Sequence, residues 1–244
     1  MDEDAANSPD TEMIQWRRDA STSRTVRLLW SLGVGTFFAA IGIIVFWRLF
    51  DIAGQIGRLA EATVAAFFAA LIVTAFAFAV TSNTEQRVAA LSRRLPVDLP
   101  TGRGLERGAD AVIGTVVMMI VIGSLMIAGR IVSQRELLEV GAGPFTGLAA
   151  LTIPLALVAL VFASFLRSVG ALDREERTIY LYDPDQAIDL EVINAISTRQ
   201  LGDATILTLE YAQPDGQYVA GPRRIVVPPA VAQELQSLVD ETTV

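Results

Sequence analysis

The chain of 244 residues contains no cysteine and no histidine. It therefore cannot form disulfides, thiolate nucleophiles, Cys/His zinc sites, His-ligated haem or a catalytic triad that uses imidazole as its base. The remaining carboxylates show no spacing from which a catalytic pair can be assigned. We expect a protein that is not an enzyme and that holds no cofactor and no metal.

Lysine is absent as well, so all 19 basic residues are arginine, against 27 acidic residues and a net charge of −8. Residues 1–171 hold 14 acidic residues and 14 arginines, whereas residues 172–244 hold 13 and 5. An acidic, lysine-free soluble part resembles proteins of salt-accumulating extreme halophiles, because high salt screens the repulsion between carboxylates. A basic partner, or a GC-rich genome that replaces lysine by arginine, would produce the same biases.

Charged residues are also scarce, at 19% of the chain, while 52% of the residues are apolar. Four apolar stretches are each about as long as the ~20 residues that cross ~30 Å of hydrocarbon as a helix. Their interiors carry no ionisable side chain, which disfavours a pump or a proton relay. We predict an α-helical membrane bundle of four transmembrane helices within residues 27–170, with spans at 28–49, 60–80, 110–132 and 145–167.

The distribution of arginine predicts the orientation of these spans. Twelve arginines flank the spans on the side of the termini and four on the other side, which places both termini in the cytoplasm of a cell-membrane protein. Residues 1–26 are polar and predict a disordered cytoplasmic tail. Five arginines in the connector 81–110 either mark topology or contact lipid headgroups: Arg87, Arg93, Arg94, Arg103 and Arg107.

Small residues repeat every four positions on the first two spans, as in helices that approach closely. We expect Gly35 and Ala39 on the first span, and Ala62, Ala66, Ala70 and Thr74 on the second, to pack within the bundle or in a homodimer. Pro154 interrupts the backbone hydrogen bonds of the fourth span and predicts a kink, which could also serve as a gate.

From residue 171 the pattern changes to short strand-like segments and a final amphipathic helix that begins near Pro229. The predicted strands are Thr178–Tyr182, Ala187–Leu190, Ala195–Arg199, Ala204–Tyr211, Gln217–Ala220 and Arg223–Val227. Residues 171–244 therefore predict a small α+β domain, acidic and cytoplasmic.

Residues 171–244 resemble prokaryotic pleckstrin-homology-like (PH-like) domains. The resemblance is carried by the element order, the run Ile188–Ile193, the segment Arg199–Asp203 and the closing Val227-Pro228-Pro229. The chain thus resembles four-span membrane proteins of extreme halophiles that carry such a domain at the C-terminus. The resemblance implies a bent sheet capped by the C-terminal helix and an adaptor or assembly role, with no catalytic motif to carry over. Because carboxylates outnumber Arg199, Arg223 and Arg224, we do not expect phosphoinositide binding.

Three functions remain open at this point. The first is a non-enzymatic multi-pass membrane protein that acts as a scaffold or adaptor through its cytoplasmic PH-like domain. The alternative is a transporter or channel component that uses the kinked fourth span, and the third is a membrane enzyme acting on a lipid headgroup with carboxylates and arginine. The expected partners are the lipid bilayer and a protein partner or second copy of the chain, but no nucleic acid.

Overall fold

The computed structural model describes residues 13–81, 103–137, 139–212 and 220–242. The chain divides into two compact units. Residues 27–163 form what we call the helical unit, and residues 1–26 together with 164–244 form the sheet unit. The helical unit is therefore inserted into the sequence of the sheet unit.

Within the described residues, the helical unit contains four helices that are long and apolar enough to cross a membrane. They are α1 (Arg24–Ile56), α2 (Arg58–Val80), α4 (Arg103–Gln134) and α5 (Gly143–Phe165). Each coincides with one of the four predicted stretches. With 33 and 32 residues, α1 and α4 are about 50 Å long at ~1.5 Å per residue, more than the ~30 Å of a hydrocarbon core.

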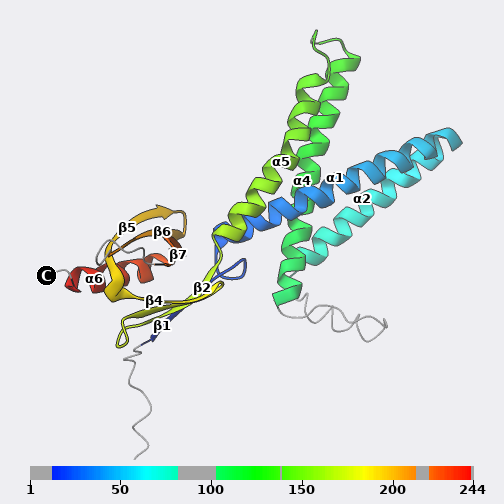
Figure 1. Cartoon of the computed structure of the whole chain (residues 1–244). Coiled ribbons are helices and arrows are strands. Elements are labelled where there is room, and N and C mark those ends of the chain that lie inside the picture. The colour runs from blue at the N-terminus through cyan, green and yellow to red at the C-terminus, as the bar shows by residue number, and fades with distance from the viewer. Residues whose placement is uncertain (1–12, 82–102, 138, 213–219, 243–244) are drawn as a thin grey trace, which may run out of the picture. The chain divides into compact units, whose positions relative to one another are not determined.

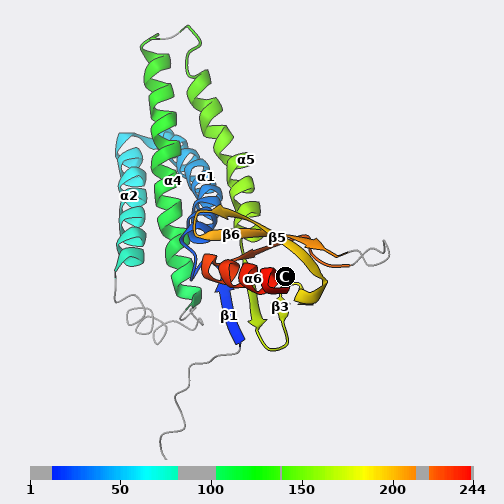
Figure 2. The ribbon, with the colours of Figure 1, turned by 90° about the vertical axis from the view of Figure 1, so that its left-hand side faces the viewer.

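The helices form two hairpins, α1 with α2 and α4 with α5 (Figures 1 and 2). Gly57 alone separates α1 from α2, and its φ of 144° lies in the region that favours glycine. In this first hairpin the rings of Phe46 and Phe68 meet edge to face at 5.1 Å.

Helices α1 and α4 approach each other closely at two glycines. A Cβ on Gly35 would lie 2.3 Å from the carbonyl carbon of Gly114, and a Cβ on Gly114 would lie 2.1 Å from the backbone oxygen of Ser31. Neither position can accept a side chain unless the helices separate, because the opposing atoms are backbone. Ala39, one turn further along α1, is fully buried. Gly35 and Ala39 thus lie at packed positions of the bundle.

The predicted small-residue stripe on α2 does not pack within the helical unit. Ala62, Ala66, Ala70 and Thr74 are all exposed. The half-buried face of α2 includes Phe68, which packs against α1 instead. The prediction of intramolecular packing through the stripe is wrong, because the aromatic face gains more contact area than the alanine face.

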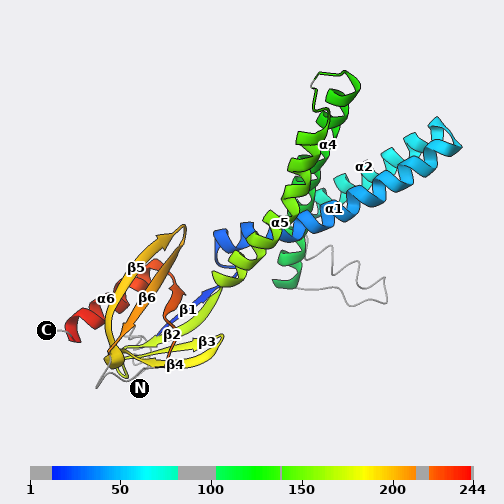
Figure 3. The same ribbon diagram turned by 45° about the horizontal axis from the view of Figure 1, so that its top comes forward.

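The sheet unit contains two antiparallel sheets (Figure 3). Sheet A has the order β1-β2-β3-β4, and sheet B has the order β5-β6-β7. The strands are β1 (Met13–Arg18), β2 (Ser168–Asp173), β3 (Thr178–Tyr182), β4 (Asp185–Asp189), β5 (Ile193–Leu201), β6 (Ala204–Tyr211) and β7 (Arg224–Val227). A 3₁₀ turn, η1 (Leu190–Val192), links the two sheets.

The chain ends with helix α6 (Pro229–Thr242), which packs against β5, β6 and η1. Its buried residues Val231, Leu235 and Val239 follow helical spacing and join a core with Leu172 and Leu207 from the two sheets. The α6 helix is also held by an ion pair of 2.8 Å between Arg174 and Glu234 and by a hydrogen bond from Arg177 to the carbonyl of Leu238. A small antiparallel-sheet domain with a terminal helix is therefore present.

Several predicted strands agree with the structure. β3 and β6 have the predicted bounds, β5 contains Ala195–Arg199, and β7 begins one residue later than predicted. The segment Ala187–Leu190 is divided between β4 and η1, because Asp189 accepts a hydrogen bond from the Glu191 N–H and starts the 3₁₀ turn. The predicted strand Gln217–Ala220 extends beyond the described residues.

The N-terminal boundary of the sheet unit differs from the prediction. A disordered tail over residues 1–26 is wrong for residues 13–18, which form β1, and for residues 24–26, which begin α1. β1 pairs with β2 in the register Met13 to Asp173 through Arg18 to Ser168. The domain therefore begins in the N-terminal segment and resumes at residue 164, not at 171, and residues 1–12 lie outside the described part.

Candidate functional site

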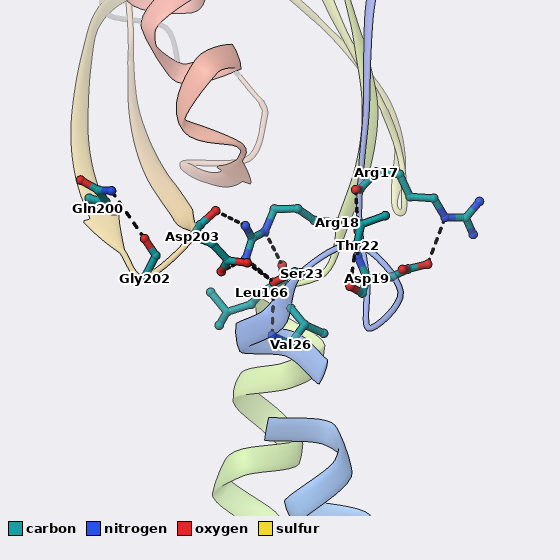
Figure 4. A network of polar contacts seen from close by, with 10 residues as sticks. All are labelled: Arg17, Arg18, Asp19, Thr22, Ser23, Val26, Leu166, Gln200, Gly202 and Asp203. Carbon is teal, nitrogen blue, oxygen red and sulfur yellow. Dashed lines mark hydrogen bonds and ion pairs between the residues drawn. The ribbon is translucent and has the colours of Figure 1, made fainter. Parts of the chain in front are cut away.

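The polar centre of the sheet unit is the guanidinium group of Arg18, at the end of β1 (Figure 4). Arg18 is only 4% exposed. Its Nε donates to the carbonyl of Leu166 at 3.4 Å, and Nη2 donates to the Ser23 hydroxyl at 3.0 Å. Nη2 also pairs with the Asp203 carboxylate at 3.1 Å, while Nη1 donates to the Asp203 carbonyl. One buried side chain thus contacts three separate segments.

Those three segments have distinct places in the chain. Ser23 lies before α1, and its Oγ accepts from the Val26 N–H at 3.2 Å, so it caps the first turn of that helix. Leu166 directly follows α5. Asp203 lies in the β5–β6 turn, next to Gly202, whose φ of 62° suits glycine. Arg18 therefore links the residue before α1 and the residue after α5 to the β5–β6 turn of sheet B.

Electrostatics fix the charge of Asp203. Desolvation is the largest single effect and raises its pKa, but hydrogen bonds from Thr25, Ser23 and Arg18 and the charge of Arg18 together hold the pKa well below its ordinary value of 3.8. Ser23 donates to Oδ2 of the same carboxylate at 2.8 Å. Asp203 therefore stays ionised at neutral pH.

A second carboxylate, Asp19, orders the turn between β1 and α1. Its side chain accepts from the Ser21 N–H at 2.8 Å and from Nε of Arg17 at 3.0 Å. Burial, the largest single effect, raises its pKa, but a hydrogen bond from the Ser21 hydroxyl, together with those from the Ser21 N–H and Arg17, outweighs it and lowers the pKa to about 2. The charged groups of the cluster are thus bonded to one another and to the backbone. This arrangement is typical of a structural cluster that connects chain segments.

A further ion pair lies in the helical unit. Nε of Arg27 on α1 donates to Oδ2 of Asp110 on α4 at 2.8 Å, and Nη2 contacts the other oxygen. Asp110 is 6% exposed. Asp110 begins the third predicted span, and sequence spacing alone does not show that Arg27 lies beside it.

The structure describes only two of the five arginines that were predicted to mark topology or to contact lipid headgroups. Arg87, Arg93 and Arg94 lie outside the described residues. Arg103 begins α4, and Arg107, one turn later, is exposed on that helix. Their assignment stays a prediction.

Pro154 lies inside α5, which continues unbroken from residue 143 to 165. The Thr152 hydroxyl donates to the carbonyl of Ala149 at 2.6 Å. Beside Thr152, a cavity of about 220 Å³ is lined by apolar side chains of α1, α4 and α5 and the hydroxyl-bearing Thr146 and Thr152. Thr36 and Thr115 likewise bond to carbonyls of their own helices, at 2.7 Å each. These hydroxyls are occupied by backbone rather than turned toward a shared polar route.

Among the described residues, no group of three or more Asp or Glu side chains is placed to hold a metal ion. A scan against protein-family models found no matching family, and searches of curated proteins and of solved structures found no match. The function must therefore be argued from the geometry of this chain.

Proposed function

We propose that the protein is a non-enzymatic multi-pass membrane protein whose PH-like domain acts as a scaffold or adaptor at the cytoplasmic face of the cell membrane. The observation that carries the membrane assignment is the apolar surface that the helical unit leaves uncovered. None of the residues in the most apolar window of α2 is buried, and only 11% of those in α5 are. Water contact with this surface would cost about 25 cal/mol per Å², whereas lipid removes that cost.

The register of sheet A supports an even number of crossings. Arg18 and Ser168 are directly paired across β1 and β2, so the chain leaves and re-enters the sheet at one point. A segment that starts and ends at one side of a membrane must cross it an even number of times, and the four apolar helices meet this condition. The excess of arginine on the side of the termini favours the cytoplasm for that side.

The PH-like assignment rests on strand order. The resemblance implies a bent sheet capped by the C-terminal helix, and two consecutive antiparallel sheets with α6 packed on their core support this proposal. In this proposal the membrane bundle is an insertion between the first two strands of the domain.

A scaffold role is favoured over transport by the chemistry of the bundle. The Thr36, Thr115 and Thr152 hydroxyls bond to their own helices, and the cavity beside Thr152 has no charged lining residue. A hydrophilic solute would find few partners there. The sheet unit, by contrast, has its own apolar core and an exposed, acidic surface that a partner protein could contact.

Membrane location and orientation are tested together. Extraction with alkaline carbonate should leave the protein in the pellet. Because the chain has no cysteine, Glu139→Cys between α4 and α5 and Gln233→Cys on α6 each create a single label site. We expect a membrane-impermeant maleimide to label the first on intact cells and the second only after lysis. Release by carbonate would remove the membrane assignment, and the reverse labelling pattern would remove the cytoplasmic one.

The scaffold role is tested by photo-crosslinking in native membranes. A photoreactive residue at Leu201, 40% exposed on β5, is compared with one at Leu148, 53% exposed on α5. We expect a discrete protein adduct from position 201 that Asp203→Ala weakens, and lipid or no protein adduct from position 148. Only lipid adducts at both positions would contradict a scaffold.

A further inference from the structure

The sheet unit contains a cavity of about 310 Å³ between the start of β2, the β3–β4 turn and β7. Its wall is apolar where Phe165, Leu181 and Ile225 contribute, and polar where Ser168 and Gln186 do. Two arginines line it, Arg167 from the segment after α5 and Arg224 from β7, together with the carboxylate of Asp183. The volume is at the lower end of the range of small-molecule sites, about 300–1,000 Å³.

These two arginines differ from most others in the sheet unit. Arg17 pairs with Asp19, Arg18 with Asp203 and Arg174 with Glu234, while Arg177 bonds to the Leu238 carbonyl and Arg223 stacks on Tyr211 at 4.7 Å. The guanidinium groups of Arg167 and Arg224 make no ion pair or hydrogen bond with any residue that the structure describes, Asp183 included. Their donors are available to a ligand.

The charge of the cavity limits what it can hold. Two guanidinium groups and one carboxylate give a formal charge of +1, which matches a monoanion better than a polyphosphate. Guanidinium binds phosphate oxygens with paired, charge-assisted hydrogen bonds, and the hydroxyl and amide of Ser168 and Gln186 add uncharged donors. A phosphate diester meets these conditions, since it carries one negative charge.

The position of the cavity in the chain favours a membrane source for that diester. Phe165 is the last residue of α5, is 50% exposed and lines the cavity, and Arg167 follows two residues later. If α5 crosses the bilayer, these residues lie at the depth of the headgroups, where phosphate diesters are concentrated.

We propose that this cavity binds a phosphate diester, with Arg167 and Arg224 as its charged ligands and Ser168 and Gln186 as hydrogen-bond donors. The placement at a lipid headgroup rests on the membrane location proposed above, whereas the binding chemistry does not. Bound headgroup would fix the sheet unit against the membrane surface.

The test uses the full chain in detergent micelles with short-chain phosphatidylglycerol as probe and measures affinity by native mass spectrometry. Arg167→Gln combined with Arg224→Gln should weaken binding about tenfold, as expected for losing both charged contacts. Arg199→Gln is the matched control, because Arg199 is exposed on β5, has no described partner and does not line the cavity. Diacylglycerol, which has no phosphate, should not bind at the cavity.

Further arms separate the outcomes. Displacement of the lipid by soluble glycerophosphoglycerol at similar concentration would support the site but assign it to a soluble diester, and retention of the lipid would assign it to the membrane.

Equal phosphatidylglycerol affinity in the wild type, the control and the double variant would overturn the proposal, as would equal binding of diacylglycerol. Arg167→Lys combined with Arg224→Lys keeps the charge but loses the paired hydrogen bonds, so it should bind more weakly than the wild type and more tightly than the double Gln variant, which guards against a folding defect. Carbonate extraction tests membrane location separately, so either idea can fail alone.

Discussion

The two units of the molecule handle polar and apolar groups in opposite ways. In the sheet unit, large apolar side chains such as Leu172, Leu207 and Leu235 are completely buried, and most arginines have partners. In the helical unit, large apolar side chains such as Ile44, Phe67 and Val161 are more than 60% exposed, while the threonine hydroxyls turn back onto their own helices. The sheet unit thus shows the burial expected of a domain in water, whereas the helical unit exposes the apolar surface expected of helices in lipid.

The units also differ in what holds them together. The helical unit relies on close backbone approach at glycine and on the ion pair between Arg27 and Asp110. The sheet unit relies on a shared apolar core and on the Arg18 cluster. Substitutions that remove one kind of contact should therefore affect one unit and spare the other.

The largest effect is expected from Asp203→Ala. It leaves Arg18 buried without its counter-charge, so the free energy of unfolding should fall by about 3 kcal/mol. This value is at the lower end of the range for buried pairs because Asp203 is 40% exposed. Replacing Trp30 and Trp47 by Phe leaves Trp16, 5% exposed in β1, as the only tryptophan of the chain. Urea unfolding followed by Trp16 fluorescence should show the loss, whereas Asp240→Ala, on the exposed face of α6, should shift the midpoint little.

Gly114→Ala comes next and should act on the other unit. Its new Cβ would meet the backbone of Ser31, so α1 and α4 must separate, at a cost of about 2 kcal/mol for overpacking. Gly108→Ala on the same helix is the control, since its Cβ would meet nothing within 4 Å, and it should stabilise the helix by up to about 1 kcal/mol. The stability of each variant is measured as the midpoint SDS concentration at which the helical circular dichroism signal is lost. Equal midpoints would mean that α1 and α4 do not pack in this way.

Acid should weaken the sheet unit first. Asp19 and Asp203 have folded-state pKa values below the ordinary 3.8, about 2 for Asp19. A lowered folded pKa contributes stability that is complete above about pH 4 and is lost as the pH falls toward 2, up to about 2 kcal/mol for Asp19. The urea midpoint followed by Trp16 fluorescence should decrease as the pH is lowered from 4 to 2, and the decrease should be smaller in Asp19→Asn. A midpoint that rises on acidification would contradict the assigned hydrogen bonds.

The smallest effect is expected from Ala66→Leu on the exposed face of α2. Because Ala66 is exposed, the substitution should change the free energy of unfolding of the bundle by less than about 0.5 kcal/mol. Phe68→Ala on the packed face should cost more, because it removes the contact with Phe46. If Ala66→Leu instead dissociates a dimer in chemical crosslinking, the stripe serves association between copies, the alternative that its periodicity leaves open.

Sequence patterns predicted the elements that depend on local periodicity. The four apolar stretches, β3, β6 and α6 agree because run length, alternation and helical spacing are each readable within one window. β1 was missed, although Ile14, Trp16 and Arg18 alternate toward the interior. The buried member of that alternation is a charge, and its strand partner lies about 150 positions away, so no local window contains the reason for its burial.

The polar cluster was missed for the same reason. In the sequence, Arg18 counts only among the arginines that flank the spans, and Asp203 only as the end of the segment Arg199–Asp203. Neither position has a neighbour in sequence that reveals the pair. The α2 stripe was misassigned in the opposite direction, since Ala62, Ala66 and Ala70 have the right spacing but are exposed. Periodicity indicates that a face exists, but the identity of the face that packs depends on the larger side chains beside it.

The pairing of β1 with β2 has a consequence for biosynthesis. Trp16 and its hydrogen-bond partner Ser168 are 152 positions apart, and at ~5–20 residues per second the ribosome needs roughly 8–30 s to make the second after the first. During that interval β1 has no strand to pair with, and all four long apolar helices are synthesised before sheet A can close. If these helices enter a membrane as proposed, the sheet can close only after the last of them has been made, and a chain stalled earlier would leave β1 unpaired.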